Sequence, residues 1–152
     1  MPRKSAGLLL YRLTTGKLEV LLVHPGGPFW ANKDAEAWSI PKGEFEENEE
    51  ALNAAMRETE EELGIKVEGK FIELSPVKQK SGKLIFAWTL ERDVDITKFT
   101  SNTFEIEWPP HSGKTQSFPE VDKAAWLTIA EAKGKINPGQ SGLLDQLEKI
   151  LG

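Results

Sequence analysis

The 152-residue sequence predicts a protein of the α/β (α+β) class, in which helices cover the faces of a β-sheet. Apolar segments rich in Leu, Val and Ile, separated by turns, alternate with two or three segments of helical character. The length is that of one ordinary domain, and neither a linker nor an internal repeat divides the chain. We therefore expect a single domain over residues 1–152 with one compact core.

The first predicted elements are two strands joined by a turn. Residues 5–13 and 18–24 are rich in Leu and Val and flank a Gly-containing turn at 14–17, which has the length of a β-hairpin loop. The first apolar run starts like a signal peptide, but Arg12 interrupts it too early. Residues 25–37 are then predicted to form a long loop, because Pro and Gly punctuate them.

A helix is predicted over residues 48–63. Gly64 stands where a left-handed C-terminal cap belongs, so the helix is expected to end there. Helical periodicity gives this segment an apolar face that consists of Leu52, Ala55, Met56, Thr59 and Leu63. Thr59 can pack its methyl group on that face while its hydroxyl bonds a preceding carbonyl.

The second half of the chain predicts four more strands and a final helix. The strands are expected at 67–74, 84–90, 104–108 and 124–128, with a turn at 80–83. Residues 109–120 contain prolines and a glycine, which favour a second long loop that could border a site. Ser141 is expected to cap an amphipathic helix that carries Leu144, Leu147 and Leu151 at helical spacing. The sequence does not decide whether this helix forms the interface of a homodimer.

The composition excludes several classes of protein. Hydrophobic residues make up 39% of the chain, and no stretch approaches the roughly 20 apolar residues of a membrane span. A net charge of −5 and a pI near 5.2 argue against broad binding to nucleic acid. The absence of cysteine excludes disulfides and thiolate metal sites and fits a reducing compartment. We therefore expect a cytoplasmic protein.

Three glutamates share one face of the predicted helix. Glu58, Glu61 and Glu62 form an acidic band, whereas Glu60 lies on the other flank. Like charges at this spacing each cost a few tenths of a kcal/mol on an isolated helix, and a bound cation would reverse that cost. Hard oxygen ligands suit Mg²⁺ or Mn²⁺. The alternative is a solvated acidic surface.

The surrounding residues complete a longer pattern. Residues 43–65, GEFEENEEALNAAMRETEEELGI, resemble the Nudix box, G-x5-E-x7-R-E-U-x-E-E-x-G-U, where U is an aliphatic residue. The matching positions are Gly43, Glu49, Arg57, Glu58, Glu61, Glu62, Gly64 and Ile65. Thr59 departs from the pattern, which prefers an aliphatic residue there.

Similarity to the Nudix hydrolases implies an αβα sandwich with a mixed β-sheet, and it implies site residues by position. Glu61 and Glu62 would be metal ligands, with the carbonyl of Lys42 or Gly43 as a further ligand. Glu58 would be a ligand or the base that activates water.

Other positions take supporting roles in the same resemblance. Arg57 would pair with Glu49 and hold loop and helix in register. Some family members draw a further ligand or base from a late loop, for which Glu120 is the candidate and Glu105 and Glu107 are the alternatives.

The predicted activity is metal-dependent hydrolysis of a nucleoside diphosphate linked to another group, such as a nucleoside triphosphate or dinucleoside polyphosphate. The alternatives are a nucleotide-binding module without catalysis and a hydrolase of diphosphoinositol or capped-RNA substrates. The segment from Trp38 to Gly43 resembles the W-x-x-P-K-G entry to the box that these enzymes share. The tyrosine that dinucleoside polyphosphate hydrolases usually carry after the box is missing, because the only tyrosine is Tyr11.

Five residues are candidates for contacts with the substrate. Lys78, Lys80 and Lys83 could reach outer phosphates, although a solvated hairpin is the favoured explanation for them. Phe29 and Trp30 could stack on a base, or they could anchor the long loop to the core.

Overall fold

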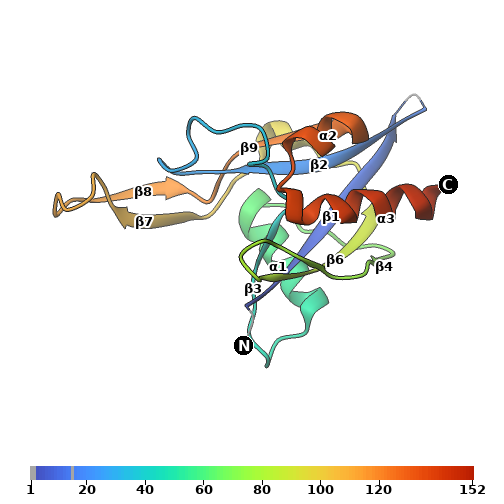
Figure 1. Cartoon of the computed structure of the whole chain (residues 1–152), viewed down its shortest axis with the longest axis horizontal. Helices are drawn as coiled ribbons and strands as arrows, with labels where there is room; N and C mark the ends of the chain where they lie inside the picture. The colour runs from blue at the N-terminus through green and yellow to red at the C-terminus, as the bar shows by residue number, and fades with distance from the viewer. Residues whose placement is uncertain (1–2, 15) are drawn as a thin grey trace.

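The computed structural model describes residues 3–14 and 16–152, and it has three layers (Figure 1). The strands are β1 (Lys4–Thr14), β2 (Lys17–Pro25), β3 (Lys42–Glu44), β4 (Ile72–Glu73), β5 (Val77–Lys78), β6 (Leu84–Glu91), β7 (Thr103–Glu107), β8 (Thr115–Pro119) and β9 (Val121–Thr128). The helices are α1 (Ala51–Leu63), α2 (Ile129–Lys135) and α3 (Ser141–Leu151), with short 3₁₀ turns η1 (Ile96–Lys98) and η2 (Pro138–Gln140).

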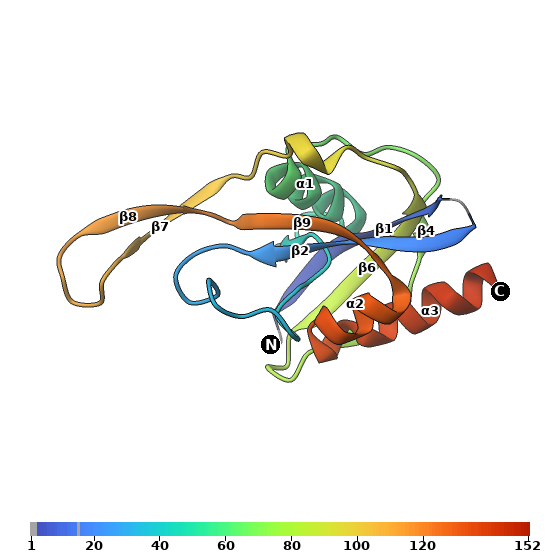
Figure 2. The ribbon, with the colours of Figure 1, turned by 90° about the horizontal axis from the view of Figure 1, so that it is seen from above.

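The main sheet has the order β4-β6-β1-β2-β9, with β3 paired to β1 and β5 paired to β6. β1 and β6 run parallel, whereas the other pairs are antiparallel, so the sheet is mixed as expected. Helix α1 covers one face, and α2 and α3 cover the other (Figure 2). The predicted αβα sandwich is thereby confirmed.

The central strand β1 is buried on both faces, which explains its continuous apolar run. Alternate side chains of a strand point to opposite faces. Leu8 and Leu10 accordingly pack in the core cluster beneath α1, whereas Leu9 and Tyr11 pack in the cluster beneath α3. The single core that we expected is therefore two apolar layers separated by the sheet.

Strands β1 and β2 diverge, and this divergence admits the segment that leads into the acidic helix. They pair over residues 11–14 and 17–20 only. Farther along, Ser39 bridges to Val23 of β2, while β3 pairs with the first half of β1. Lys42 and Gly43 therefore lie beside the centre of the sheet, directly against α1.

Helix α1 begins three residues later than predicted and ends where predicted. Gly64 adopts a left-handed conformation, with φ of 69°, and its N–H donates to the Glu60 carbonyl at 2.7 Å. The Thr59 hydroxyl donates to the Ala55 carbonyl at 2.8 Å, as expected. The predicted core face is shifted, because Ala54 is fully buried whereas Met56 is half-buried.

The structure corrects several predictions in the second half of the chain. Residues 109–120 are not wholly a loop, because β8 pairs with β7 in a separate two-stranded hairpin. Its side chains are mostly exposed, so the sequence lacks the apolar alternation that marks a half-buried strand. Of the strand expected at 67–74, only β4 forms: its two residues pair with Thr89 and Trp88 of β6, and Leu74 adds one hydrogen bond to the Ala87 carbonyl.

The end of the chain also differs from what the sequence predicted. Helix α2 was not predicted, although Thr128 and Glu131 form the reciprocal capping box that marks its start. Ser141 does not cap α3, since its hydroxyl donates to the Pro138 carbonyl. Leu151 is exposed rather than buried. No helix in residues 3–14 and 16–152 has the length and apolar character required to cross a bilayer.

Substituting Gly64 by alanine is expected to destabilise the fold by at least about 1 kcal/mol. A Cβ atom there would be strained by the positive φ and would lie 2.9 Å from the Thr100 carbonyl oxygen. The matched control is Gly113→Ala, because Gly113 has φ of 74° and no neighbour within 4 Å. Urea unfolding should show a larger loss for Gly64→Ala, and equal losses would exclude a role for the Thr100 contact.

Candidate active site

Glu58 lies directly against the loop that precedes its helix. Its carboxylate occupies the space that a side chain at Gly43 would need, so the close approach requires glycine. The Glu58 side chain is 12% exposed. Burial, followed by the charge of Glu61, raises the pKa of Glu58 to about 7. This carboxyl group is therefore poised to exchange a proton near neutral pH.

Glu62 is the second perturbed carboxyl group. Burial raises its pKa to about 8, and the nearby charges of Glu58 and Glu120 add to this effect. The Lys42 ammonium group and a hydrogen bond from the Lys42 backbone oppose the increase. Burial in turn lowers the pKa of Lys42, as does Lys83 nearby. Glu62 and Lys42 thus lie near each other in a desolvated environment that disfavours the charged form of both.

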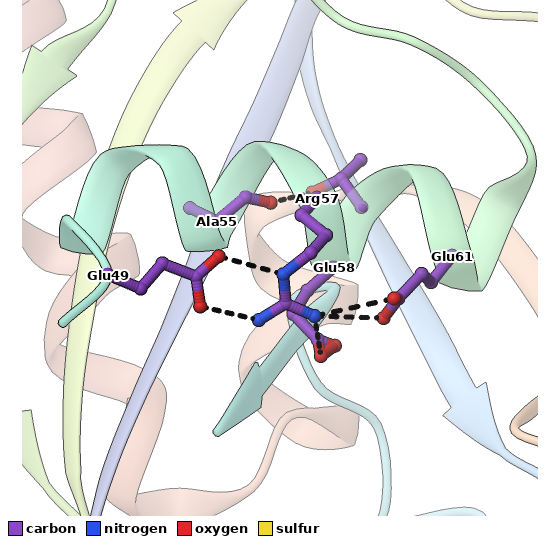
Figure 3. A network of polar contacts seen from close by, with 6 residues as sticks. Glu49, Ala55, Arg57, Glu58 and Glu61 are labelled. Carbon is purple, nitrogen blue, oxygen red and sulfur yellow. Dashed lines mark hydrogen bonds and ion pairs between the residues drawn. The ribbon is translucent and has the colours of Figure 1, made fainter. Parts of the chain in front are cut away.

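Arg57 joins the loop to the helix (Figure 3). Its Nε and Nη2 donate to the two oxygens of Glu49 at 2.8 and 2.9 Å, a bidentate pair. Its Nη1 donates to Glu58 at 3.1 Å and to Glu61 at 3.2 Å. The predicted Arg57–Glu49 ion pair is present, and the same guanidinium also orients two glutamates of the acidic band.

Glu120 is brought to this cluster from the far end of the chain by backbone contacts. The Asn102 N–H donates to the Glu61 carbonyl, and the Glu120 N–H donates to the Asn102 carbonyl, both at 2.8 Å. The Gly26 N–H then donates to the Glu120 carbonyl at 2.9 Å. Burial and the charge of Glu61 raise the pKa of Glu120. A chain of hydrogen bonds thus connects the end of α1, Glu120 and the long loop.

The two alternatives to Glu120 lie elsewhere. Glu105 is exposed on β7, opposite Ser117. Glu107 accepts hydrogen bonds from the backbone N–H groups of His111 and Gly113 at the tip of the hairpin. Neither residue lines the cleft described next.

A cleft of about 350 Å³ unites these groups. It is lined by Pro25, Gly26, Trp30, Lys42, Gly43, Glu58, Glu62, Phe104 and Glu120. Trp30 was a candidate from the sequence, but Phe104 was not, because an aromatic residue in a strand is usually part of the core. The lining of the cleft therefore combines an acidic wall, which consists of Glu58 and Glu62, with an aromatic wall, which consists of Trp30 and Phe104.

The three lysines after the acidic helix do not line this cleft. Lys78 is exposed at the end of β5, and Lys80 is exposed in the turn that follows. Lys83 lies closer, since its Nζ is 3.6 Å from Glu44 in β3 and its charge acts on Lys42. Of the three, Lys83 alone is placed where it could act on a ligand at Lys42.

A buried glutamine, which the sequence did not single out, holds the approach to Lys42. The Gln140 Oε1 accepts from the Ile40 N–H at 3.1 Å, and its Nε2 donates to Gln79 at 2.9 Å. His24 is buried and contacts Asp122 at 2.8 Å and the Lys33 carbonyl at 2.6 Å. Gln140 thus fixes the segment that leads to Lys42, and His24 fixes the long loop after β2.

The donor groups of the cleft fit a hard divalent cation. Across the described residues, no group of three or more histidine or acidic side chains is arranged so that it could hold a metal ion. Glu58 and Glu62 nevertheless present desolvated carboxylates to the same cleft as Lys42 and Gly43. Mg²⁺ commonly takes one or two carboxylates together with waters and phosphate oxygens, so a small set of protein ligands is suitable.

The raised pKa of Glu62 predicts how stability depends on pH in metal-free protein. Between its ordinary value of 4.5 and about 8, the folded state binds more protons than the unfolded state. This contribution to stability is complete below 4.5 and is lost as the pH rises through about 8, and Glu58 adds a similar loss through about 7.

The thermal midpoint in chelator should therefore fall by several degrees between about pH 5 and about pH 8. Glu62→Gln should flatten this dependence. The pKa of Glu49, lowered by Arg57, acts in the opposite sense, but only at lower pH. A midpoint that rises over this range would contradict the prediction.

Fold and cleft together define a class, the α+β sandwich hydrolases whose acidic residues lie on one loop and helix. The family model of the NUDIX domain matches residues 1–147. This chain therefore belongs to the Nudix hydrolase family. Nudix hydrolases generally use divalent metal ions.

Two relatives carry the name of the asymmetrical bis(5′-nucleosyl)-tetraphosphatase. The Caenorhabditis elegans protein is 40% identical over 62 residues, which are 41% of this chain and 41% of that protein. The Rattus norvegicus protein is 30% identical over 109 residues, 63% of this chain and 70% of that protein. Nudix hydrolase 7 of Arabidopsis thaliana is 32% identical over 70% of this chain. The chain spans 41% of the worm relative and 38% of the plant relative.

Solved structures share the fold. A C. elegans Ap4A hydrolase in a binary complex has a TM-score of 0.66 and 24% identity, over 98% of this chain and 97% of that one. The NUDIX domain of Shewanella oneidensis NrtR complexed with ADP ribose has a TM-score of 0.69 and 16% identity, over 100% and 90%. The TM-scores show that the fold is shared, and because the identities are below 25% the likeness extends to the fold alone.

Proposed function

We propose that this protein is a metal-dependent pyrophosphohydrolase that cleaves the diphosphate bond of a nucleoside diphosphate linked to another group. The substrate class that we favour is nucleoside triphosphates or dinucleoside polyphosphates. The observation that carries the proposal is the pair of desolvated glutamates, Glu58 and Glu62, in one cleft with Lys42. Such perturbed carboxyl groups in a cleft are typical of a catalytic site.

Each residue of the cleft would have its own role in binding the metal or transferring a proton. Glu61 and Glu62, with the carbonyl of Lys42 or Gly43, would hold Mg²⁺ or Mn²⁺, with Glu120 as a further ligand. Bound Mg²⁺ supplies neutralisation of phosphate charge and a more acidic water. Glu58 would be a further ligand or the base that takes the proton of the attacking water, and its pKa of about 7 in the metal-free protein suits the second role.

Arg57 has a positioning role in this scheme. It holds the Glu58 carboxylate in place while Glu49 fixes the guanidinium from the other side. Lys42, at the acidic wall, would attract the anionic phosphates of the substrate. The negative net charge elsewhere would then matter little, because the local field in the cleft is set by the cation and Lys42.

The substrate class draws support from the relatives. The worm and rat relatives are named as hydrolases of bis(5′-nucleosyl) tetraphosphates, and one similar structure holds ADP ribose. All of these ligands contain a nucleoside diphosphate. A cytoplasmic location stays a prediction from the sequence.

Turnover of a substrate panel tests the proposal. The panel contains diadenosine tetraphosphate, nucleoside triphosphates, ADP ribose, a diphosphoinositol phosphate and capped RNA, each with Mg²⁺, with Mn²⁺ and with EDTA. We expect hydrolysis of a nucleotide substrate that EDTA abolishes and added Mg²⁺ restores. Metal-dependent binding without turnover of any compound would instead favour a non-catalytic nucleotide-binding module.

A further inference from the structure

The segment 38–42 changes from one strand to another just before it reaches the cleft. Ser39 pairs with β2 through two backbone hydrogen bonds of 2.8 and 3.0 Å. Two residues later the Pro41 carbonyl accepts a hydrogen bond from β1 at 3.2 Å. Ile40 lies between these contacts, at the point where the segment leaves β2 for β1. The position of Lys42 therefore depends on what holds Ile40.

Gln140, in the turn η2 just before α3, holds Ile40 from the other end of the chain. Its side chain is fully buried, and its Oε1 accepts from the Ile40 N–H at 3.1 Å. The Ser39 hydroxyl donates to the Ile40 carbonyl at 2.6 Å and accepts from the Gln140 Nε2 at 3.1 Å. Side chains thus bond both backbone polar groups of Ile40. A buried network with its hydrogen bonds satisfied is rigid.

Gln140 is itself fixed from two directions. Its Nε2 also donates to the Gln79 Oε1 at 2.9 Å. The turn packs so closely there that a Cβ atom at Gly139 would lie 2.7 Å from the Gln79 Cα. On the other side, the Asn137 N–H donates to the Trp38 carbonyl at 2.8 Å. The connection between α2 and α3 therefore holds the segment 38–40 through its backbone and through the Gln140 amide.

The link from Ile40 to Glu62 is short and stiff. The ring of Pro41 fixes its own φ, so this residue has little freedom. The next residue is Lys42, whose backbone N–H donates to the Glu62 carboxylate. Ile40, Lys42 and Glu62 also line one small cavity of about 80 Å³. A displacement of Ile40 would therefore reach the Glu62 carboxylate through two peptide units.

We propose that Gln140 is a positioning residue that sets the affinity of the cleft for a divalent cation, a role that rests on the proposed function. Gln140 does not line the cleft. It would act through the backbone of Ile40 and Lys42, which orients Glu62 and the carbonyls next to it. Removing a hydrogen-bond partner of this kind typically weakens metal binding 10- to 100-fold.

Three variants test this role by binding of Mn²⁺ alone, measured by calorimetric titration without substrate. Gln140→Met keeps the length of the side chain and removes both polar ends. Gln140→Asn keeps the amide but is one methylene too short to reach the Ile40 N–H. The matched control, Gln79→Met, removes the other partner of the same amide and leaves the bond to Ile40 in place.

Both Gln140 variants should raise the Kd for Mn²⁺ at least about tenfold, and Gln79→Met should stay within about twofold of the parent. Thermal melts in EDTA show whether each variant is folded, and Gln140→Asn carries the comparison if Gln140→Met does not fold. A merely structural role would lower the thermal midpoints of the Gln140 and Gln79 variants without weakening Mn²⁺ binding.

A parent-like Kd in the folded Gln140 variants would overturn the proposal. Equal weakening by Gln79→Met would do the same, since that variant keeps the bond to Ile40. Failure of the proposed hydrolysis would appear separately, as Mn²⁺ binding that depends on Gln140 without turnover of any compound in the substrate panel.

Discussion

Glu58→Gln and Glu62→Gln are each expected to lower kcat by at least about a hundredfold, the low end of general-base effects. Glutamine keeps the size of each side chain but can neither accept a proton nor bind a cation with a full negative charge. Both carboxyl groups are desolvated in the cleft, so solvent cannot readily replace either one. Steady-state kinetics on the nucleotide substrate found in the panel would measure the loss.

The same helix offers a control. Glu60 is exposed and does not line the cleft, so Glu60→Gln should leave kcat within about twofold of the parent. Glu62→Gln should also melt no earlier than the parent at about pH 8, since it removes a carboxyl group that burial disfavours in its charged form. Near-normal turnover in both cleft variants would remove these residues from the chemistry.

Gly43→Ala is expected to reduce activity about as much as Glu58→Gln does. The added methyl group would occupy the position of the Glu58 carboxylate and force it out of the cleft. The Glu58 side chain is flexible and can swing away, so the fold should survive. We expect a loss of at least about a hundredfold in kcat with a thermal midpoint close to that of the parent.

Gly134→Ala serves as the comparison for this variant. Gly134 lies in α2 with no neighbouring atom within 4 Å of an added Cβ, so its substitution should not affect kcat. Parent-like activity in Gly43→Ala would mean that the close approach of loop and helix is not needed. A large drop in its thermal midpoint would show that the backbone moves instead of the side chain.

The loop and helix of the site were predictable because their geometry is local. Glu58, Glu61 and Glu62 lie on one side of α1 as the helical period requires, and Arg57 reaches Glu49 only eight positions away. Gly64 ends the helix for a reason that belongs to its own backbone. Even here the sequence assigned the same role to Glu61 and Glu62, whereas Glu61 accepts a hydrogen bond from Arg57 and Glu62 accepts one from the Lys42 backbone.

The opposite wall of the cleft was less predictable. Glu120 was one of three candidates, and its backbone contacts with Asn102 and Gly26 favour it over the others. Phe104 was expected only as a strand residue, and β8, its partner strand, was expected as loop. In β7, Phe104 and Ile106 alternate with polar residues and so predict a strand, whereas β8 is mostly exposed outside the main sheet and its sequence carries no such pattern.

By itself, the sequence determined the sandwich class, the acidic helix and the family. These features depend on spacing within about 20 neighbouring residues, where helix period and turn chemistry are sufficient. Only the tertiary structure decided which distant groups share the cleft with that helix. Gln140 bonds Ile40 from 100 positions away, and the placement of Glu120, Trp30 and Phe104 depends on how β1 and β2 diverge and how the loop packs on the hairpin. Such contacts arise from long-range packing, which leaves no periodic signal along the chain.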